Sequence, residues 1–291
     1  MKAAVTAIKF FEHFANKGIR GTITTKFFSF LLKSIKPRGK MIDSNLQLVY
    51  PDSSQQWRKE IRTKLYEHLA WLITETLVLQ RDHSQAFEWV KKVHNEEIIN
   101  DLLDNKKGAI FLTGHFGNWE LLGNWYAMNA QKHGHKLHIV FQELHDQDIW
   151  NYVKQTREST GEIMLPKNMS VQKYARMLKE GMHLAILDDI SGSGKMIVPF
   201  MGHDATNMPG PAVMAMLSGV PVIPACIYRN GPFNHEIEFF EPLKLPNKDK
   251  NLTHEERLRL VVLEFNKALE KFIRKRPEQW FWLHNRWKRR K

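Results

Sequence analysis

The chain has 291 residues, enough to bury a sizeable hydrophobic core, and we expect one domain rather than two. It contains one cysteine, Cys226, which excludes an internal disulfide and any cysteine-based metal cluster. The formal net charge of +12 indicates an anionic partner, for which a membrane surface and a nucleic acid are the obvious choices.

The positive charge is concentrated at the two ends of the chain. Residues 1–40 hold nine Lys and Arg residues against the single acid Glu12, and residues 271–291 hold nine against Glu278, so the remainder is slightly acidic. Apolar side chains interleave with these basic ones. That pattern favours contact with an anionic bilayer over the alternative of a solvated basic face on packed helices. Because no recognised nucleic-acid-binding motif accompanies the charge, we expect no nucleic-acid partner.

The start of the chain predicts one or two helices over 4–35, ended by Lys36-Pro37-Arg38-Gly39. The longest apolar run here is far shorter than the ~20 residues that cross a bilayer, so we expect no transmembrane helix. No secretory signal is evident, because basic residues are scattered through the segment without a small-residue cleavage site. We therefore divide the chain into a basic amphipathic membrane-facing segment, 1–40, and a domain, 41–291. The expected location is the cytoplasm or the cytoplasmic face of a membrane.

Beyond Tyr50-Pro51-Asp52-Ser53, apolar residues recur at close to the 3.6-residue helical period. They are Trp57, Ile61, Leu65, Leu69, Leu72 and Leu77. This spacing predicts a long helix, and a shorter helical stretch is expected around 84–104.

From residue 109 onward, strands and helices alternate. Strands are expected at 109–113, 137–141, 162–165, 183–188, 221–228 and 236–241, and helices at 118–129, 147–159, 170–180, 209–218 and 253–275. This alternation is typical of a single α/β domain with a largely parallel central sheet, flanking helices and a closing antiparallel edge. Ligands bind at the carboxyl ends of such strands, which is where His115, Gln142 and Asp188 fall.

The stretch from Gly108 to Glu120 combines a strand, a tight turn and two chemically capable side chains. Its apolar run predicts a buried strand, and Gly114 and Gly117 punctuate the turn that follows. Asn118 is placed to cap the next helix, with Glu120 in the first turn, where a carboxylate suits the positive end of the helix dipole.

His115 and Glu120 are the predicted catalytic residues. On one continuous helix their side chains would point roughly 140° apart, at about 100° per residue, and would not meet. With the histidine in the turn and the glutamate in the helix, both can face the end of the sheet. The carboxylate would then hold one imidazole nitrogen, leaving the other as a base for a substrate hydroxyl near neutral pH.

Other chemistries fit the sequence less well. Neither the zinc-protease helix pattern nor a Cys/His cluster is present, so we expect no metal or other cofactor. Gly192-Ser193-Gly194-Lys195 resembles the tail of a phosphate loop, but Asp189 and Met196 break that pattern, and we expect a flexible loop instead. No Gly-x-Ser-x-Gly elbow is present. Asp188 and Asp189 could hold a polar group of a substrate or cap a loop, and Cys226 is expected to be a buried strand thiol.

Gly114-His-Phe-Gly-Asn-Trp-Glu120 resembles the His-x4-Asp/Glu motif of the glycerolipid acyltransferase superfamily, in particular its bacterial lipid A late acyltransferases. The resemblance covers about residue 40 to the end. Later blocks that are similar to the family, in the same order, are Asp188, Val198-Pro-Phe-Met-Gly202, Met208-Pro-Gly-Pro211, Gly219-Val-Pro-Val-Ile-Pro224 and Pro277-Glu-Gln-Trp-Phe-Trp-Leu-His-Asn-Arg-Trp-Lys288. Two positions depart from it: Gln142 stands where the family often has arginine, and Asp189 replaces the usual glutamine.

The resemblance implies transfer of a fatty acyl chain from acyl carrier protein or acyl-CoA to a hydroxyl of a membrane glycolipid, without a metal, at the cytoplasmic face of the bacterial inner membrane. His115 would be the general base and Glu120 its orienting partner. Backbone amides between Phe116 and Asn118 would stabilise the oxyanion, so Phe116, Gly117 and Asn118 are expected to bind substrate, with Gln142 and Asp188. The basic ends would meet the leaflet, the acceptor phosphates and an acidic carrier protein.

Three alternatives stay open on the sequence alone. One is an acyltransferase for another glycolipid or a lysophospholipid, such as a phosphatidylinositol mannoside. Another is a thioesterase or other hydrolase that uses the same His/Glu pair with water as acceptor. The last is a basic membrane or nucleic-acid adaptor without catalytic activity.

Overall fold

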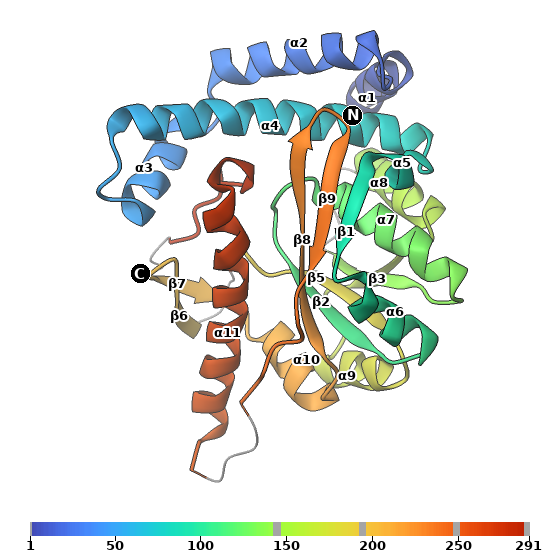
Figure 1. Ribbon diagram of the computed structural model, residues 1–291, viewed down its shortest axis with the longest axis vertical. Helices are drawn as coiled ribbons and strands as arrows, with labels where there is room; N and C mark the ends of the chain where they lie inside the picture. Colours follow the sequence, from blue (N-terminus) through green and yellow to red (C-terminus); the bar gives the residue numbers. More distant parts are fainter. Residues whose placement is uncertain (1, 142–146, 192–195, 247–250, 288–291) are drawn as a thin grey trace.

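A seven-stranded sheet forms the centre of the molecule, and helices cover both of its faces (Figure 1). The computed structural model describes residues 2–141, 147–191, 196–246 and 251–287. The strand order is β1-β9-β8-β2-β5-β3-β4. The strands span Val90–His94 (β1), Ala109–Thr113 (β2), Leu137–Phe141 (β3), Ile163–Pro166 (β4), His183–Leu187 (β5), Val222–Gly231 (β8) and Asn234–Phe239 (β9). The single α/β domain predicted from the alternation of elements is confirmed.

The central strand β2 lies between β5 and β8 and runs parallel to both. Each of its residues is buried, as expected for a strand covered on both faces. Ile110 and Leu112 face one apolar cluster, and Ala109 and Phe111 face the other, because alternate side chains point to opposite faces. β2 therefore holds the turn that follows it in a fixed position.

One edge of the sheet differs from the prediction. β9 pairs antiparallel with β8, as expected for the closing strand, but β1 adds beyond β9 in parallel and becomes the edge. β1 falls inside the stretch 84–104 that was predicted as helical, which instead forms α5 (Gln85–Trp89), β1 and α6 (Glu96–Asp104). Five residues, Val-Lys-Lys-Val-His, are too short to give a clear strand period beside two amphipathic helices.

Helices pack on the two faces and across one end of the sheet (Figure 1). They span Lys2–Phe14 (α1), Ile19–Ile35 (α2), Gly39–Val49 (α3), Gln55–Arg81 (α4), Trp119–Lys132 (α7), Gln147–Ser159 (α8), Val171–Lys179 (α9), Gly210–Ser218 (α10) and His254–Lys275 (α11). The long helix predicted after residue 53 is α4, and the Ser54 hydroxyl caps it by accepting a hydrogen bond from the Trp57 amide. α11 begins with a Thr253–Glu256 capping box, and the apolar face predicted for it is buried.

Two further elements were not expected from the sequence. α3 follows directly after the Lys36-Pro37 break, and a hairpin of β6 (Met196–Phe200) and β7 (His203–Asn207) forms in a stretch for which no strand was predicted. Met201 and Gly202 both adopt positive φ in the hairpin turn, as a tight turn with the right-handed twist of a hairpin requires. The flexible loop predicted at 192–195 lies outside the described residues.

Candidate active site

The turn between β2 and α7 is built by its two glycines. A Cβ on Gly117, which has φ +59°, would lie 1.7 Å from the Ile227 carbonyl oxygen, so only glycine fits there. A Cβ on Gly114 would lie 2.9 Å from Cγ of Asp189. The absence of a side chain at Gly114 therefore lets a carboxylate from the end of β5 come close to the turn.

That carboxylate, on Asp189, holds His115. Asp189 Oδ1 lies 2.8 Å from His115 Nδ1, and its Oδ2 accepts a hydrogen bond from the His115 backbone amide at 2.7 Å. Trp280 Nε1 donates to the same Oδ2 at 2.8 Å. The Asp189 side chain is only 2% exposed, whereas that of His115 is 23% exposed. His115 is thus fixed through Nδ1, its Nε2 forms no hydrogen bond among the described residues, and the ring lines a cavity.

The predicted hydrogen bond between His115 and Glu120 is wrong in this structure. Glu120 instead accepts hydrogen bonds from Arg157, at 2.8 and 3.1 Å to its two carboxylate oxygens, and from the indole of Trp119. The physical reason lies in the sheet order. Because β5 pairs with β2, the residues that follow β5 lie beside the turn that follows β2, and Asp189 is therefore in hydrogen-bonding distance of His115. Glu120 still contributes to the electrostatics of His115, because both line the same cavity.

Each member of the His115–Asp189 pair shifts the pKa of the other. Burial alone would lower the pKa of His115, but the charge and hydrogen bond of Asp189 outweigh it and raise that pKa above 6.5, with Glu120 adding to the effect. Burial alone would raise the pKa of Asp189, but His115 and the indole of Trp280 lower it. An ionised aspartate beside an imidazole stabilises the imidazolium that forms when the ring takes a proton.

The backbone amides expected to stabilise an oxyanion already have partners. The Phe116 amide donates to the Gly114 carbonyl at 2.7 Å, and the Gly117 amide donates to the Gln279 carbonyl at 3.0 Å. Phe116 is buried against Tyr228 and Phe272. Neither residue therefore presents a free donor to a substrate, contrary to the sequence-based expectation.

Asn118 is likewise committed to the fold. Its Oδ1 accepts a hydrogen bond from the Leu121 amide, which confirms the predicted N-cap of α7, and its Nδ2 donates to Glu75 at 2.8 Å. The side chain is fully buried. A direct substrate contact by Asn118 is therefore not compatible with this geometry.

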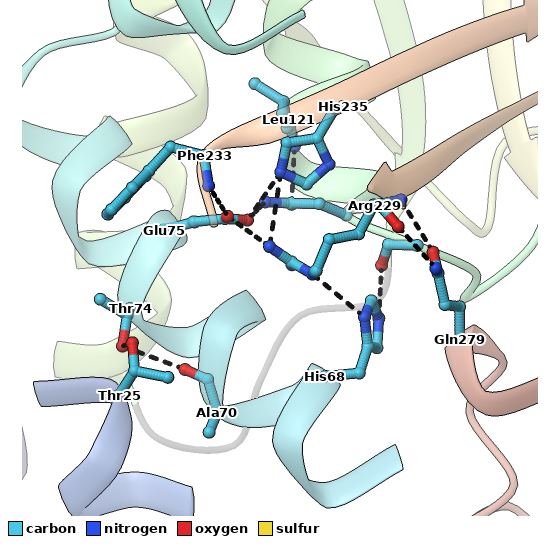
Figure 2. A network of polar contacts seen from close by, with 12 residues as sticks. Thr25, His68, Ala70, Thr74, Glu75, Leu121, Arg229, Phe233, His235 and Gln279 are labelled. Atoms are coloured by element: carbon cyan, nitrogen blue, oxygen red, sulfur yellow. Dashed lines mark hydrogen bonds and ion pairs between the residues drawn. The ribbon is translucent and has the colours of Figure 1, made fainter. Parts of the chain in front are cut away.

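A buried ionic cluster lies against the turn between β2 and α7 (Figure 2). Glu75 of α4 accepts hydrogen bonds from Asn118, Arg229, His235 and the Phe233 amide. Burial alone would raise the pKa of Glu75, but Arg229 and His235 lower it below 4.5. We call Glu75, Arg229 and His235 the Glu75 cluster.

Two further contacts tie the Glu75 cluster to the turn. His68 bonds the Gly117 carbonyl through Nε2 at 3.2 Å and receives a hydrogen bond from Arg229 through Nδ1 at 3.2 Å (Figure 2). Gln279 exchanges hydrogen bonds with the Arg229 backbone, at 2.9 Å in both directions. The cluster therefore anchors both sides of the turn to α4 and β8.

The C-terminal segment closes over the same turn. After the short helix η1 (Pro277–Gln279), the Phe281 amide donates to the His115 carbonyl at 3.0 Å, and Trp280 forms an isolated bridge with Phe116. The Phe281 ring also contacts the His115 ring, with centroids 6.0 Å apart. This is the physical role of the closing block singled out in the sequence: it fixes the backbone of His115 and supplies the indole that bonds Asp189.

A mainly apolar cavity of about 940 Å³ opens beside His115. Its walls come from α7, β2, β3, β5 and the start of α10, and its ionisable lining includes His115, Glu120, Arg157 and Glu162. Drug-sized ligand pockets fall in the range of about 300–1,000 Å³, so this cavity has room for a long aliphatic chain.

Asp188 does not join this site as predicted. Asp188 is buried and interacts electrostatically with Arg286. Its Oδ2 has no hydrogen-bond partner among the described residues. Burial raises the pKa of Asp188 to about 7, with Arg286 opposing the rise and Asp189 adding to it. Its backbone amide bonds the Thr113 carbonyl at 3.0 Å, joining the ends of β5 and β2. Gln142 lies outside the described residues.

The comparisons with known proteins agree with the motif. A family model described as bacterial lipid A biosynthesis acyltransferase matches residues 3–289. The chain belongs to the bacterial lipid A biosynthesis acyltransferase family. It is therefore an acyltransferase of the kind that transfers groups other than aminoacyl groups, as the resemblance implied.

Individual relatives of this family are distant in sequence. A lipid A biosynthesis lauroyltransferase of Escherichia coli (strain K12) is 25% identical over 269 residues, which covers 89% of this chain and 82% of the relative. A palmitoleoyltransferase of the same organism is 22% identical, covering 88% and 80%. A phosphatidylinositol mannoside acyltransferase of Mycolicibacterium smegmatis (strain ATCC 700084 / mc(2)155) is 25% identical over 203 residues, covering 67% and 60%.

Sequence reasoning missed the roles of Asp189, Arg157 and Glu75. Two consecutive acids at the end of a predicted strand were a signal for Asp189, but the neighbour relation between β2 and β5 was needed to connect it with His115. Arg157 lies on α8, 37 residues from Glu120, and no local pattern links the two. Glu75 looks like any other polar position of a long helix until its burial is known.

Proposed function

We propose that the protein moves a fatty acyl chain from an acyl carrier protein or acyl-CoA thioester to a hydroxyl of a membrane glycolipid, with a lipid A precursor as the first candidate acceptor. The observation that carries this proposal is the His115–Asp189 pair, whose imidazole lines the apolar cavity. An oriented imidazole beside space for an aliphatic chain is what acyl transfer to an alcohol requires. The relatives' names supply the acceptor class: two act in lipid A biosynthesis and one on phosphatidylinositol mannoside.

The proposed reaction begins with proton transfer. His115 Nε2 takes the proton of the acceptor hydroxyl, and Asp189 stabilises the imidazolium through Nδ1. The acceptor oxygen bonds to the thioester carbonyl carbon and a tetrahedral oxyanion forms. Collapse of that intermediate breaks the carbon–sulfur bond, and the imidazolium returns its proton to the leaving thiolate. The products are an ester and a free thiol, so atoms and charge balance.

Arg157 is the proposed stabiliser of the oxyanion, with Glu120 as its positioning residue. The amides of Phe116 and Gly117 are occupied, whereas the Arg157 guanidinium lines the cavity and is 24% exposed at its side chain. Glu120 raises the pKa of Arg157 and holds the guanidinium by two hydrogen bonds. A fixed positive charge in a largely apolar site stabilises developing negative charge strongly. Glu120 thereby keeps a role in catalysis without touching His115.

The membrane-facing part of the proposal rests on α2. A helix of a water-soluble domain normally turns its large apolar side chains inward. In α2 the buried residues are the small ones, Gly21, Thr24 and Thr25, and Thr25 bonds Thr74 of α4 at 2.9 Å (Figure 2). Of its eight large apolar side chains, Phe28 and Leu32 are half-buried against the core. The other six are exposed: Ile19, Ile23, Phe27, Phe30, Leu31 and Ile35.

This exposed stripe carries basic neighbours. Arg20, Lys26 and Lys36 are exposed on or next to α2, which lies outermost over α4 (Figure 1). Apolar side chains that enter the acyl region and cations that reach headgroup phosphates are the two elements of interfacial binding. Among the described residues no helix is long and apolar enough to cross a bilayer. We therefore infer that residues 1–40 dock the domain on the cytoplasmic face of the inner membrane.

Incubation of purified protein with acyl carrier thioester, with and without the glycolipid acceptor, tests the proposed function. We expect ester formation that needs both substrates. Release of the free thiol and mass spectrometry of the lipid product measure it. Thioester cleavage at an unchanged rate without acceptor would favour a hydrolase instead. Lipid profiles of cells lacking the protein distinguish acceptors, because loss of one acyl chain from lipid A, and not from another glycolipid, is the expected result.

A further inference from the structure

One buried carboxyl group in the cavity has no part in the proposed reaction. Glu162 directly precedes β4, lines the cavity and is only 4% exposed. Its Oε2 has no hydrogen-bond partner among the residues that the structure describes. Buried polar atoms nearly always have a partner, and an unpartnered one that lines a ligand cavity is placed where a ligand can supply that partner.

The surroundings of Glu162 keep the carboxyl group in place without satisfying it. A Cβ on Gly123 would lie 2.9 Å from Glu162 Oε1, so the missing side chain on α7 makes room for the carboxyl group. Arg157 is close enough to interact electrostatically, but its guanidinium hydrogen bonds go to Glu120. Burial raises the pKa of Glu162 to about 8, with Arg157 opposing the rise and Glu120 adding to it. At neutral pH the group is therefore a neutral acid that can donate one hydrogen bond and accept others.

The distance of Glu162 from the His115 turn can be measured along α7, because Gly123 of this helix lies next to the Glu162 carboxyl group. This helix begins at the His115 turn and runs away from it, and Gly123 follows Glu120 by three residues, which is about 4.5 Å along the axis. Apart from Arg157 and Glu120, the cavity lining here includes apolar side chains such as Leu122. A chain that has its carbonyl carbon at His115 and follows α7 inward passes Glu162 within its first few carbons. A saturated chain would leave the carboxyl group unpartnered.

We propose that Glu162 forms a polar subsite that selects acyl donors carrying a hydroxyl group on one of the first carbons of the chain. The inference rests on the proposed function, because it specifies the donor of the same site. A hydroxyl group both donates and accepts, so it can satisfy the carboxyl proton and the free Oε2 together. A site that is built to bond a hydroxyl discriminates strongly against the analogue without it, since a buried polar group is then left unpaired.

Binding to the full-length chain tests the subsite without turnover. The probes are non-hydrolysable pantetheine amides of myristic acid and of its α- and β-hydroxy derivatives, measured by isothermal titration calorimetry. We expect wild-type protein to bind one hydroxylated probe about tenfold or more tightly than the plain one. Glu162→Leu should remove this preference, and Glu162→Gln should retain most of it, because an amide also donates and accepts. Equal binding of all three probes by wild-type protein, or an unchanged preference in Glu162→Leu, would overturn the proposal.

The matched control is Glu158→Gln, which removes an exposed carboxylate on α8 and should leave the preference unchanged. Glu162→Leu replaces an unpartnered polar group by an apolar one, so we expect it to fold, with a thermal midpoint at or above that of wild type. If it does not fold, the wild-type and Glu162→Gln titrations still decide. Transfer rates with the matching thioesters separate the two proposals. A binding preference without transfer to any glycolipid rejects the proposed function alone, whereas transfer with equal rates and equal binding rejects the subsite alone.

Discussion

Two ionic groups contact the same turn, and they differ in whether they reach the cavity. In the Glu75 cluster, the carboxylate accepts hydrogen bonds from four donors, and Glu75 and His235 are fully buried. In the His115–Asp189 pair, the aspartate is equally enclosed, but the imidazole is partly exposed and lines the cavity. The residues of the Glu75 cluster do not line the cavity and hold backbone in place, whereas an imidazole that lines the cavity can exchange a proton with a ligand. The Glu75 cluster therefore supports the turn, whereas the His115–Asp189 pair is suited to the chemistry.

The largest expected effect is the loss of the base. His115→Ala should lower kcat for acyl transfer by about 10³–10⁴-fold, because it removes both proton abstraction and proton return. The variant should still fold cooperatively, since the Asp189 carboxylate keeps its hydrogen bonds from the backbone amide of residue 115 and from the Trp280 indole. Rates with a fixed thioester and acceptor, together with thermal unfolding, measure this. Full transfer activity in the folded variant would remove His115 from the chemistry.

The Glu75 cluster should show the opposite profile. Glu75→Ala leaves Arg229 buried without its carboxylate, so we expect it to cost about 3–5 kcal/mol of unfolding free energy. Chemical denaturation of the variant and of wild type measures the difference. The control is Glu67→Gln on the same helix, whose exposed pair with Lys33 should contribute at most about 1 kcal/mol. Equal effects of the two substitutions would show that the cluster does not hold the fold.

Acid should act through the same cluster. The pKa of Glu75 is lower in the folded chain than its ordinary value of 4.5. Its stabilisation is therefore fully present above that ordinary value and is lost as the pH falls toward the folded pKa. We expect the unfolding free energy of wild type to decrease as the pH drops below about 4.5. Glu75→Gln should lose this part of the pH dependence. Parallel pH curves for the two proteins would contradict the assignment.

Membrane docking should respond to a smaller change on α2. Phe30 is 73% exposed, and Phe30→Glu removes an aromatic ring from the exposed stripe and adds a negative charge. The expected loss is ~1.5–3 kcal/mol, or roughly a tenfold to hundredfold weaker binding to anionic vesicles. Co-sedimentation measures it. Leu260→Glu, at an exposed apolar position of α11, is the control and should bind as wild type does.

The sequence predicted what local patterns encode. The β2 strand, the glycine turn and the Asn118 cap follow from hydrophobic period and side-chain chemistry within 13 residues, and all three are confirmed. The partner of His115 could not be predicted in this way. Asp189 is 74 residues away, and only the order of the strands in the sheet brings it to the turn, ahead of the nearer Glu120. The Glu75 cluster joins α4, β8 and β9 over still longer separations.

The most direct test is the pH dependence of kcat/KM for acyl transfer in wild type, Asp189→Asn and Glu120→Gln. A general base must be unprotonated, so kcat/KM should rise with pH through the pKa of His115, which in wild type lies above the ordinary 6.5. Because Asp189 raises that pKa more than Glu120 does, Asp189→Asn should move the acidic limb to lower pH by the larger amount. It should also cost roughly 10²–10⁴-fold in kcat. A larger shift in Glu120→Gln, with the limb of Asp189→Asn unchanged, would contradict the pairing of His115 with Asp189.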